Sequence, residues 1–311
     1  MLRFFGYQRP RRVGVPVVVI GNVLVGGTGK TPLLIDLALD LQDRGWKPGV
    51  VSRGYGGSAR IPSLVDAHGG AAAFGDEPIL IRYLARVPVA VGRDRVAAAR
   101  VLLAAHKECN LILSDDGLQH RRLARDLEIC VVNSRGMGNG LLLPAGPLRD
   151  PPRRLARVDA VVLNGITPPV RIYSPFFRME TRIEEAISIA DAQQRMSLAA
   201  LVLEQKEKSL RILAACALGT PDGFFSMLGE AGLRFATLAL PDHAALDVAA
   251  LRGPWDRILV TEKDAVKCYR DPALSRDPRL WVVPLHAEVD PALADFVDAR
   301  LRSLAHGSAP A

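Results

Sequence analysis

The sequence predicts an α/β fold built on a parallel sheet, and three observations lead to that prediction. Residues 15–20 form a β-branched apolar run, which is typical of a buried parallel strand. A glycine-rich stretch follows directly, and beyond it apolar residues recur at helical spacing as far as Gly45. The rest of the chain alternates short apolar runs with helical patterns, as βαβ units do.

The stretch between the first strand and the first helix has the residues of a phosphate-binding loop. Its glycines free backbone N–H groups to face a phosphate, and the helix start adds a dipole that favours anions. Lys30 is placed to reach the β- and γ-phosphates of a nucleotide, and the Thr31 hydroxyl is placed to bind Mg²⁺. The loop is expected to consist of Leu24, Val25, Gly26, Gly27, Thr28, Gly29, Lys30 and Thr31.

One position departs from the strict pattern of such loops. The first glycine of the motif is replaced by Leu24, and Gly26 and Gly27 are expected to loosen the loop nearer the lysine. The alternative is a glycine-rich turn with an incidental lysine. The order of strand, loop and helix favours the nucleotide-phosphate site.

The bulk composition narrows the class of protein. A length of 311 residues favours about two domains, and 49% hydrophobic with 23% charged residues indicates a globular chain. The net charge of +7 suits an anionic partner, either nucleic acid, an acidic membrane or a phosphorylated substrate. Nucleic acid ranks last because only 5% of residues are aromatic and the sequence has no RNP-like or zinc-finger pattern. The four cysteines form no CxxC pair, which predicts reduced, buried thiols, and no apolar run is long enough to span a membrane.

The next elements continue the alternation. Strands are expected at 49–52, 88–91 and 127–132, with a helix over 97–105. The adjacent acids Asp76 and Glu77 come just before an apolar helix. From the residues alone, a role in capping that helix is favoured over a role in catalysis.

A further strand over 111–115 ends in acid. Asp115 and Asp116 occupy the place of the carboxylates that hold Mg²⁺ across from a phosphate-binding loop. Aspartates are also common in turns, but the preceding loop motif favours metal binding. Gln119 continues the chain at the same edge of the sheet.

After a last strand of this part, at 158–163, the composition changes. An extended segment over 171–179, with 197–204 as its possible partner, is expected to lead into a second β/α series. That series has strands at 210–215, 257–260 and 280–284, a helix over 222–232 and a terminal helix to about residue 304. His243 follows a probable strand end, where a histidine is more often structural than catalytic.

Two segments have alternative interpretations. The aromatic and basic residues 1–12 could lie on an anionic membrane or form a solvated tail. The Gly/Pro-rich segment 136–150 contains Leu141–Leu143, which could touch a lipid. The arginines that follow it could hold a phosphate or form a solvated basic face.

Taken together, these motifs resemble the tetraacyldisaccharide 4′-kinase family. The matching pieces lie in family order along nearly the whole chain, so the set is specific where a phosphate-binding loop alone would be weak. They are the segments 19–32, 51–56, 75–78, 115–120, 138–149, 242–243 and 261–267.

The resemblance implies a P-loop kinase-like α/β/α sandwich and a second, smaller α/β/α domain, joined by a short β linker. We expect a nucleotide-binding domain at 1–168, the linker at 169–207 and a C-terminal domain at 208–311. The implied reaction moves the γ-phosphoryl group of ATP to the 4′-hydroxyl of a tetraacyl glucosamine disaccharide 1-phosphate and yields lipid IVA.

The resemblance also assigns roles to residues. Asp76 becomes the general base, assisted by His243, which reverses both preferences stated above. Lys30 and Asp116 join them as catalytic residues, while Thr31, Glu77, Asp115 and Gln119 manage Mg²⁺ and water. The implied location is cytoplasmic, peripheral on the inner membrane, with an acylated disaccharide phosphate as partner, no nucleic acid, and an oligomeric state that the sequence leaves open.

The chain departs from the family pattern in three places. Only 12 residues precede Val13, where relatives usually have a longer hydrophobic segment. Asp150 stands where glutamate is expected, and Ala244 stands where a second histidine or an aromatic residue is common. The alternative functions are a P-loop kinase for another small hydroxyl acceptor and a P-loop ATPase switch that binds a partner.

Overall fold

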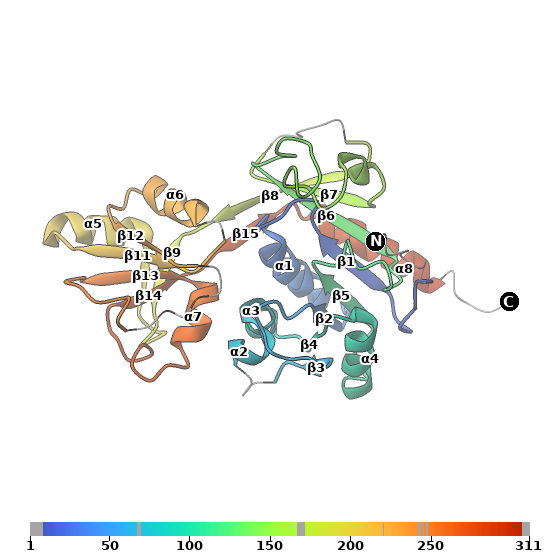
Figure 1. The fold of residues 1–311 in the computed structure, drawn as a ribbon, viewed down its shortest axis with the longest axis horizontal. Helices are drawn as coiled ribbons and strands as arrows, with labels where there is room; N and C mark the ends of the chain where they lie inside the picture. Colours follow the sequence, from blue (N-terminus) through green and yellow to red (C-terminus); the bar gives the residue numbers. More distant parts are fainter. Residues whose placement is uncertain are drawn as a thin grey trace.

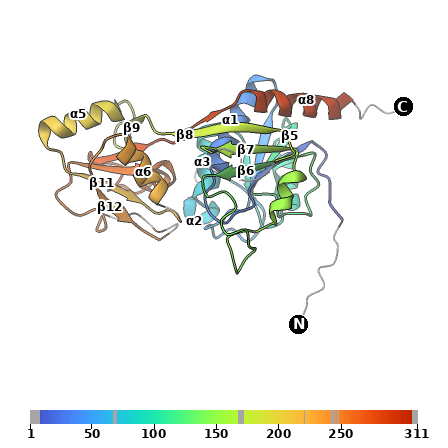
Figure 2. The same cartoon turned by 90° about the horizontal axis from the view of Figure 1, so that it is seen from above.

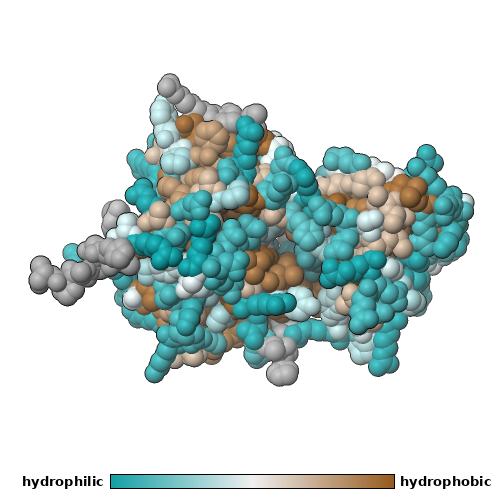
Figure 3. Space-filling model, turned by 180° about the vertical axis from the view of Figure 1, so that it is seen from behind, coloured by the Kyte–Doolittle hydropathy of each residue, from teal (hydrophilic) through white to brown (hydrophobic). Residues whose placement is uncertain are grey.

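A computed structural model describes residues 9–66, 70–166, 172–219, 221–241, 244, 246 and 248–306. The chain folds into two bodies that lie side by side (Figure 1). The larger body contains the first strand and helix, and the smaller body contains most of the second β/α series. The space-filling view shows a hollow in the surface where the two bodies meet (Figure 3).

The larger body is built on a nine-stranded sheet within the described part of the chain. Most neighbouring strands are parallel, and antiparallel pairs occur at the two edges. In spatial order the strands are β15 (His286–Val289), β8 (Phe176–Arg182), β7 (Ala160–Asn164), β6 (Leu127–Asn133), β1 (Val17–Gly21), β5 (Leu111–Asp115), β2 (Pro48–Ser52), β4 (Val89–Val91) and β3 (Ser63–Leu64).

Helices cover both faces of this sheet because the central strands are apolar on both sides. Val18 and Ile20 of β1 point into one core, while Val17 and Val19 point into the other. The first core includes residues from α1 (Lys30–Asp43), α3 (Asp76–Ala85) and α8 (Ala292–His306). The second includes residues from α4 (Arg95–Ala105) and the short helix η1 (Pro152–Ala156), and a one-turn helix α2 (Ala71–Phe74) precedes α3.

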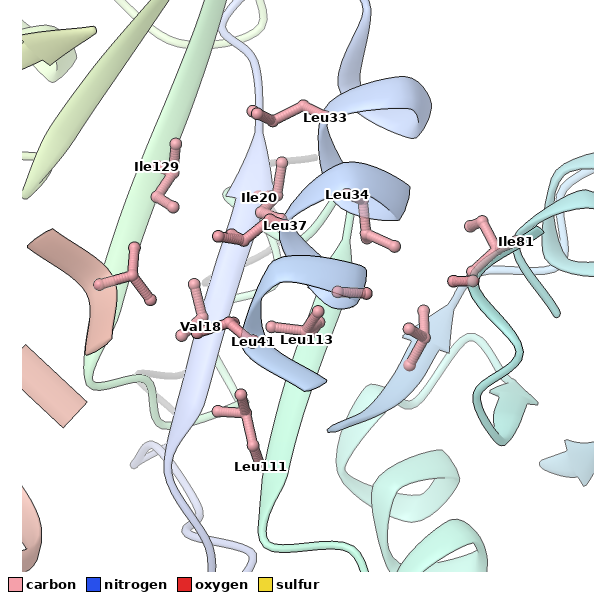
Figure 4. Close-up of a cluster of buried hydrophobic side chains, with 14 of the residues drawn as sticks. Val18, Ile20, Leu33, Leu34, Leu37, Leu41, Ile81, Leu111, Leu113 and Ile129 are labelled. Carbon is pink, nitrogen blue, oxygen red and sulfur yellow. The ribbon is translucent and has the colours of Figure 1, made fainter. Parts of the chain in front are cut away.

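Helix α1 lies directly over β1 and β5. Its leucines at positions 33, 34, 37 and 41 fall on one face and are buried against those strands (Figure 4). This packing fixes where α1 begins, and therefore where Lys30 and Thr31 stand at the carboxyl end of β1.

The smaller body is a second three-layer unit. Among the described residues its sheet has the order β10 (Arg195–Ser197), β9 (Glu185–Ser188), β14 (Leu280–Val283), β13 (Arg257–Thr261), β11 (Ile212–Cys216) and β12 (Ala236–Ala239). Helices α5 (Leu198–Lys208) and α6 (Asp222–Glu230) contribute to the core on one face, and α7 (Glu262–Cys268) contributes to the core on the other.

Strands β8 and β15 carry the chain between the two bodies. They pair antiparallel, with His286 opposite Arg182, so the chain enters and leaves the smaller body along one two-stranded ribbon. Helix α8 then returns to the larger body, where the Phe296 ring packs at a tilt against Phe177 and Asp298 accepts a hydrogen bond from Trp46.

The position of β15 and α8 in the larger body differs from the expectation that residues 208–311 form one C-terminal domain. Residues from β15 onward belong with the first sheet because Val297 and Leu301 are buried in the core around α1. The expected linker also differs, since 197–204 is largely helix α5 and β8 pairs with β7 and β15. We propose that the domains are 9–182 with 286–306, and 183–285.

Two further sequence expectations can be compared with the structure. All four cysteines are free and buried, as expected for reduced thiols. Within the described ranges, none of the helices has both the length and the apolar character needed to cross a membrane.

Candidate active site

The loop between β1 and α1 wraps its backbone toward the start of α1. Gly26 and Gly29 have φ angles of 92° and 93°, in the left-handed region that favours glycine. Gly29 is also the N-cap of α1, and a Cβ there would lie 2.5 Å from the Asn164 side-chain nitrogen. The buried Asn22 amide donates to the Thr28 hydroxyl at 3.0 Å, which closes the loop internally. The loop therefore has the shape of a phosphate cradle.

Leu24, the departure from the loop motif, has a structural role. Its side chain is buried in the second core of the larger body, and its backbone forms a β-bridge with Leu148. Val25 donates to the Pro147 carbonyl at 2.9 Å, and Arg149 donates to the Val23 carbonyl at 2.7 Å. The segment 147–149 thus holds the first residues of the loop by backbone hydrogen bonds, at the position where the strict motif has a glycine.

Three charged groups meet beside the cradle. Arg149 makes a bidentate ion pair with Asp116, at 2.7 and 2.9 Å, and Lys30 Nζ lies 3.6 Å from Asp116 Oδ1. Burial tends to raise the pKa of Asp116, but the hydrogen bonds from Arg149 and the charge of Lys30 outweigh it, so the pKa lies below its usual value. The positively charged side chains of Lys30 and Arg149 are therefore held beside the cradle by Asp116, where they could contact a phosphate.

Asp115 ends β5 next to β1 and is buried. Ser52 at the end of β2 donates to Asp115 Oδ2 at 2.8 Å. Burial, with repulsion from Glu77 and Asp116, raises the pKa of Asp115 to about 7. Arg95 lies buried nearby, and burial lowers its pKa although Asp115 and Asp116 oppose that change. Asp115 is the carboxylate of this group that would gain most from a bound cation.

Gln119 is tied to the base of the cradle through its amide nitrogen. Nε2 donates to the Asn22 carbonyl at 3.0 Å and to Asp150 Oδ2 at 2.7 Å. Its Oε1 is buried and has no hydrogen-bond partner among the described residues. Asp150, which replaces the expected glutamate, is thus long enough to hold Gln119.

Asp76 and Glu77 begin helix α3, and they do not cap it. The N-cap is Gly75, with φ 88°, and it makes no side-chain capping bond. The capping interpretation from the sequence is therefore wrong. Asp76 is only 3% exposed, and a Cβ on Gly75 would come within 2.3 Å of the Tyr55 carbonyl oxygen, so this turn is closely packed.

Two lysines of the smaller body face these two acids. Lys267 Nζ lies 3.2 Å from Asp76 Oδ2, and Lys263 Nζ lies 3.9 Å from Glu77 Oε1. The lysines are one turn apart on α7, so the N-terminus of α3 is matched by one face of a helix from the other body. Lys267 also lies 3.7 Å from Asp264, a carboxylate with no exposed surface whose pKa is raised by its burial.

The expected site residues are thus linked across the two bodies. Lys30, Asp115 and Asp116 form one group at the cradle, and repulsion between Glu77 and Asp115 connects that group to the start of α3. Thr31 lies in the first turn of α1, beside Lys30. His243, the expected assistant of Asp76, lies outside the described residues.

A scan against protein-family models matches residues 2–302 to the model described as tetraacyldisaccharide-1-P 4′-kinase. The chain belongs to this family. It is therefore a kinase, a phosphotransferase with an alcohol acceptor.

Individual relatives agree with this family assignment. A tetraacyldisaccharide 4′-kinase of Janthinobacterium sp. is 48% identical over 298 residues, covering 96% of this chain and 85% of the relative. One from Chromobacterium violaceum is 46% identical over 304 residues, covering 96% and 87%. A crystal structure of LpxK from Aquifex aeolicus in complex with ATP superposes with a TM-score of 0.75 at 25% identity, covering 95% of this chain and 91% of that one.

The contacts of three side chains of this kinase site are not predicted from the sequence. Ser52 reaches Asp115 because β2 and β5 are adjacent, and Lys267 reaches Asp76 because α7 packs near α3. Arg149 was considered only as one of several phosphate-binding or solvated arginines, and it pairs with Asp116. A signal for Lys267 existed in the matching segment 261–267, but its partner lies about 190 residues away in the chain.

Proposed function

We propose that this chain transfers the γ-phosphoryl group of ATP to the 4′-hydroxyl of a tetraacyl glucosamine disaccharide 1-phosphate, giving lipid IVA. The observation that carries the proposal is the arrangement of Asp76. A buried carboxylate at the start of α3 faces Lys267 of the smaller body, and its neighbour Glu77 is electrostatically coupled to Asp115 at the phosphate cradle. An acceptor held between the two bodies would have both the base and the nucleotide on its larger-body side, with Lys267 of the smaller body beside the base.

The nucleotide end of the reaction is supported by the cradle and its cations. Backbone N–H groups of residues 26–29 and the N-terminus of α1 would hold the phosphates. Lys30 and Arg149, now paired with Asp116, would neutralise charge on the β- and γ-phosphates. The proposed ATP-binding residues are therefore 24–31, with Arg149 added.

The donor set also fits Mg²⁺. Over the described ranges, no group of three or more His, Cys, Asp or Glu side chains surrounds a metal position. Magnesium in kinases needs only one or two carboxylates, because phosphates and water complete its shell. Asp115 and the Thr31 hydroxyl would hold the ion, and Glu77 and Gln119 are proposed to bind it or its waters, since Gln119 Oε1 has no hydrogen-bond partner in the described part of the chain. The ion would neutralise phosphate charge.

At the acceptor end, Asp76 is the proposed general base. Its carboxylate would take the proton of the 4′-hydroxyl as that oxygen forms a bond to the γ-phosphorus. The bond from the γ-phosphorus to the β,γ-bridging oxygen breaks, and ADP leaves with that electron pair. Lys267 would hold the Asp76 carboxylate in place, and His243 is proposed to assist it on the strength of the resemblance.

The acceptor also suggests where the protein works. A tetraacyl disaccharide is held in a membrane, so we place the protein in the cytoplasm, on the cytoplasmic face of the inner membrane. An anionic membrane surface would attract a chain with a net charge of +7.

The direct test is an acceptor assay with Mg-ATP and the tetraacyl disaccharide 1-phosphate in non-ionic detergent micelles. The expected product carries a new phosphate at the 4′-position, and the matched control is the Asp76→Asn variant. No product from a folded wild-type protein that binds ATP would exclude the proposed acceptor.

The same assay separates the alternatives. Higher turnover of soluble sugars than of the acylated disaccharide would indicate a kinase for another hydroxyl acceptor. Rapid ATP hydrolysis without acceptor, together with nucleotide-dependent dimerisation, would indicate an ATPase switch.

A further inference from the structure

The loop from Gly138 to Ala145 presents three consecutive leucines to solvent. Leu141, Leu142 and Leu143 are 52%, 47% and 55% exposed, and every residue from 138 to 145 is exposed and uncharged. Contiguous exposed apolar surface of this kind is rare on soluble proteins and marks a binding surface. In Figure 2 this loop, the green segment after β6, projects from the larger body on the side away from α8.

The loop is ordered by its own hydrogen bonds, so the leucines are held outward. Leu143 donates to the Leu148 carbonyl at 2.9 Å, and Leu148 donates to the Leu141 carbonyl at 3.1 Å. The Asn139 side chain closes the turn by donating to the Ala145 carbonyl at 3.1 Å and accepting from Leu141 at 3.1 Å. A preformed apolar tip loses little conformational entropy when it binds.

Arginines flank this tip on both sides in the chain. The segment 135–157 contains five arginines and one aspartate. Arg153 in η1 and Arg157 just after it are exposed, and no acid among the described residues lies within ion-pair distance of either. The segment 9–12, with exposed Arg9 and Arg11 and with Arg12 paired to Asp126, leaves the larger body on the same side (Figure 2).

We propose that Leu141–Leu143 insert into an anionic bilayer while the neighbouring arginines contact its headgroups. A projecting tip of leucines beside arginines matches the layered chemistry of a membrane surface. A protein partner would instead favour aromatic anchors, since leucine is under-represented in binding hot spots. The inference rests on the proposed function in one respect, because a membrane-held acceptor gives the contact its use.

The position of the loop gives the contact a consequence for the site. Leu148 at its base bridges Leu24 in the phosphate cradle, and the next residue, Arg149, pairs with Asp116. The membrane contact is therefore one short, hydrogen-bonded segment away from the phosphates, and insertion would set the height of the site above the bilayer.

The test compares binding to vesicles of phosphatidylcholine alone and of phosphatidylcholine with 30 mol% phosphatidylglycerol. The wild type is expected to bind the anionic vesicles, and the double change Leu141→Ser with Leu142→Ser is expected to weaken that binding at least about tenfold. The matched control is Leu203→Gln, which changes a leucine 60% exposed on α5 of the smaller body and should leave binding unchanged.

The pair Arg153→Gln and Arg157→Gln should lower binding about fivefold per charge, and only to the anionic vesicles.

A second readout reports insertion directly. All four native cysteines are buried, so Leu142→Cys can be labelled selectively with the environment-sensitive dye NBD. Its emission should shift to the blue with anionic vesicles, whereas the same label at Leu203→Cys should not shift. No vesicle binding by the wild type, or equal binding by the double variant with no shift at position 142, would overturn the proposal.

Kinase assays separate this inference from the proposed function. Turnover of acceptor in detergent micelles should be the same for wild type and the Leu141/Leu142 double variant, and turnover of acceptor in vesicles should fall for the variant. Absence of product in both media for the wild type would defeat the proposed function, whatever the vesicle binding shows.

Discussion

Asp76 is the residue on which the proposed chemistry depends most. It is buried at the start of α3 and paired with a lysine of the other body, while the cradle contacts are made by other residues. Its role can therefore be separated from nucleotide binding by substitution.

The change Asp76→Asn keeps the size of the side chain and removes its ability to accept a proton. We expect kcat to fall by about 10²–10⁴-fold, the range for a lost general base. ATP affinity, measured by calorimetry, should change by less than about twofold, because the proposed contacts with ATP are made by other residues. Asp43→Asn at the end of α1 is the control, and a loss of ATP binding in Asp76→Asn would instead assign Asp76 to the metal or the fold.

A second residue-scale prediction concerns Asp36 on α1, away from the site. Partial burial and the charge of Asp40 raise its pKa from 3.8 to about 6. The folded state therefore favours protonated Asp36, so its stabilising contribution is full below pH 3.8 and is lost as the pH rises through 6.

The variant Asp36→Asn should consequently be more stable than the wild type above pH 7 and nearly equal to it below pH 4. With solvent screening of a partly exposed group, the gain is about 1 kcal/mol or less, or a Tm rise of about 2 °C. Thermal unfolding at several pH values measures it. The same Tm difference at every pH would contradict the assignment.

At the scale of elements, α7 and α3 carry the contact between the bodies. Lys263 and Lys267 on one helix face meet Glu77 and Asp76 on the other. The closer pair, formed by Lys267, is also the more buried, so it should matter more.

Lys267→Met should lower kcat about tenfold or more with little change in the KM for ATP, because it releases the Asp76 carboxylate. Lys263→Met should have a smaller effect, since Glu77 is partly exposed, and Lys206→Met on α5 should have none. Partial rescue by Lys267→Arg would support positioning by charge. A rise in the KM for ATP together with a fall in the Tm of Lys267→Met would indicate a purely structural role for Lys267.

The sequence predicted the elements with strong local patterns. The strand and the helix around the phosphate loop are predicted correctly because a β-branched run and a leucine periodicity are patterns within a short stretch of sequence. The acid at the end of β5 is predicted for the same reason. Residues 197–204 were expected as a strand but form most of α5, where Ser197 caps the helix and Leu198 and Leu201 fall on one buried face. The partnerships of Arg149 with Asp116 and of Ser52 with Asp115 depend on which strands become neighbours, which no local pattern reports.

At the scale of the whole molecule, the last helix belongs to the first sheet. Leu301 has no exposed surface and packs in the core around α1, although it lies more than 250 residues from that helix. The stability of the nucleotide-binding part therefore depends on the end of the chain.

Leu301→Ala should destabilise the larger body by about 2–4 kcal/mol, through lost burial and the cavity left behind. Denaturant unfolding followed by the fluorescence of Trp46, which hydrogen-bonds to α8, measures this change. Leu304→Ala on the same helix, at a position 39% exposed, is the control and should cost far less. An equal cost for the two variants would mean that α8 is not anchored through Leu301.

The ribbon of β8 and β15 constrains how the two bodies can move. A single tether would let the smaller body swivel, whereas two paired strands resist twisting and leave bending across the ribbon as the easiest motion. In any opening and closing of the two bodies about this ribbon, α7 would return along the same arc, and Lys267 would meet Asp76 again. The ribbon would thus act as a one-axis hinge that keeps the two bodies in register.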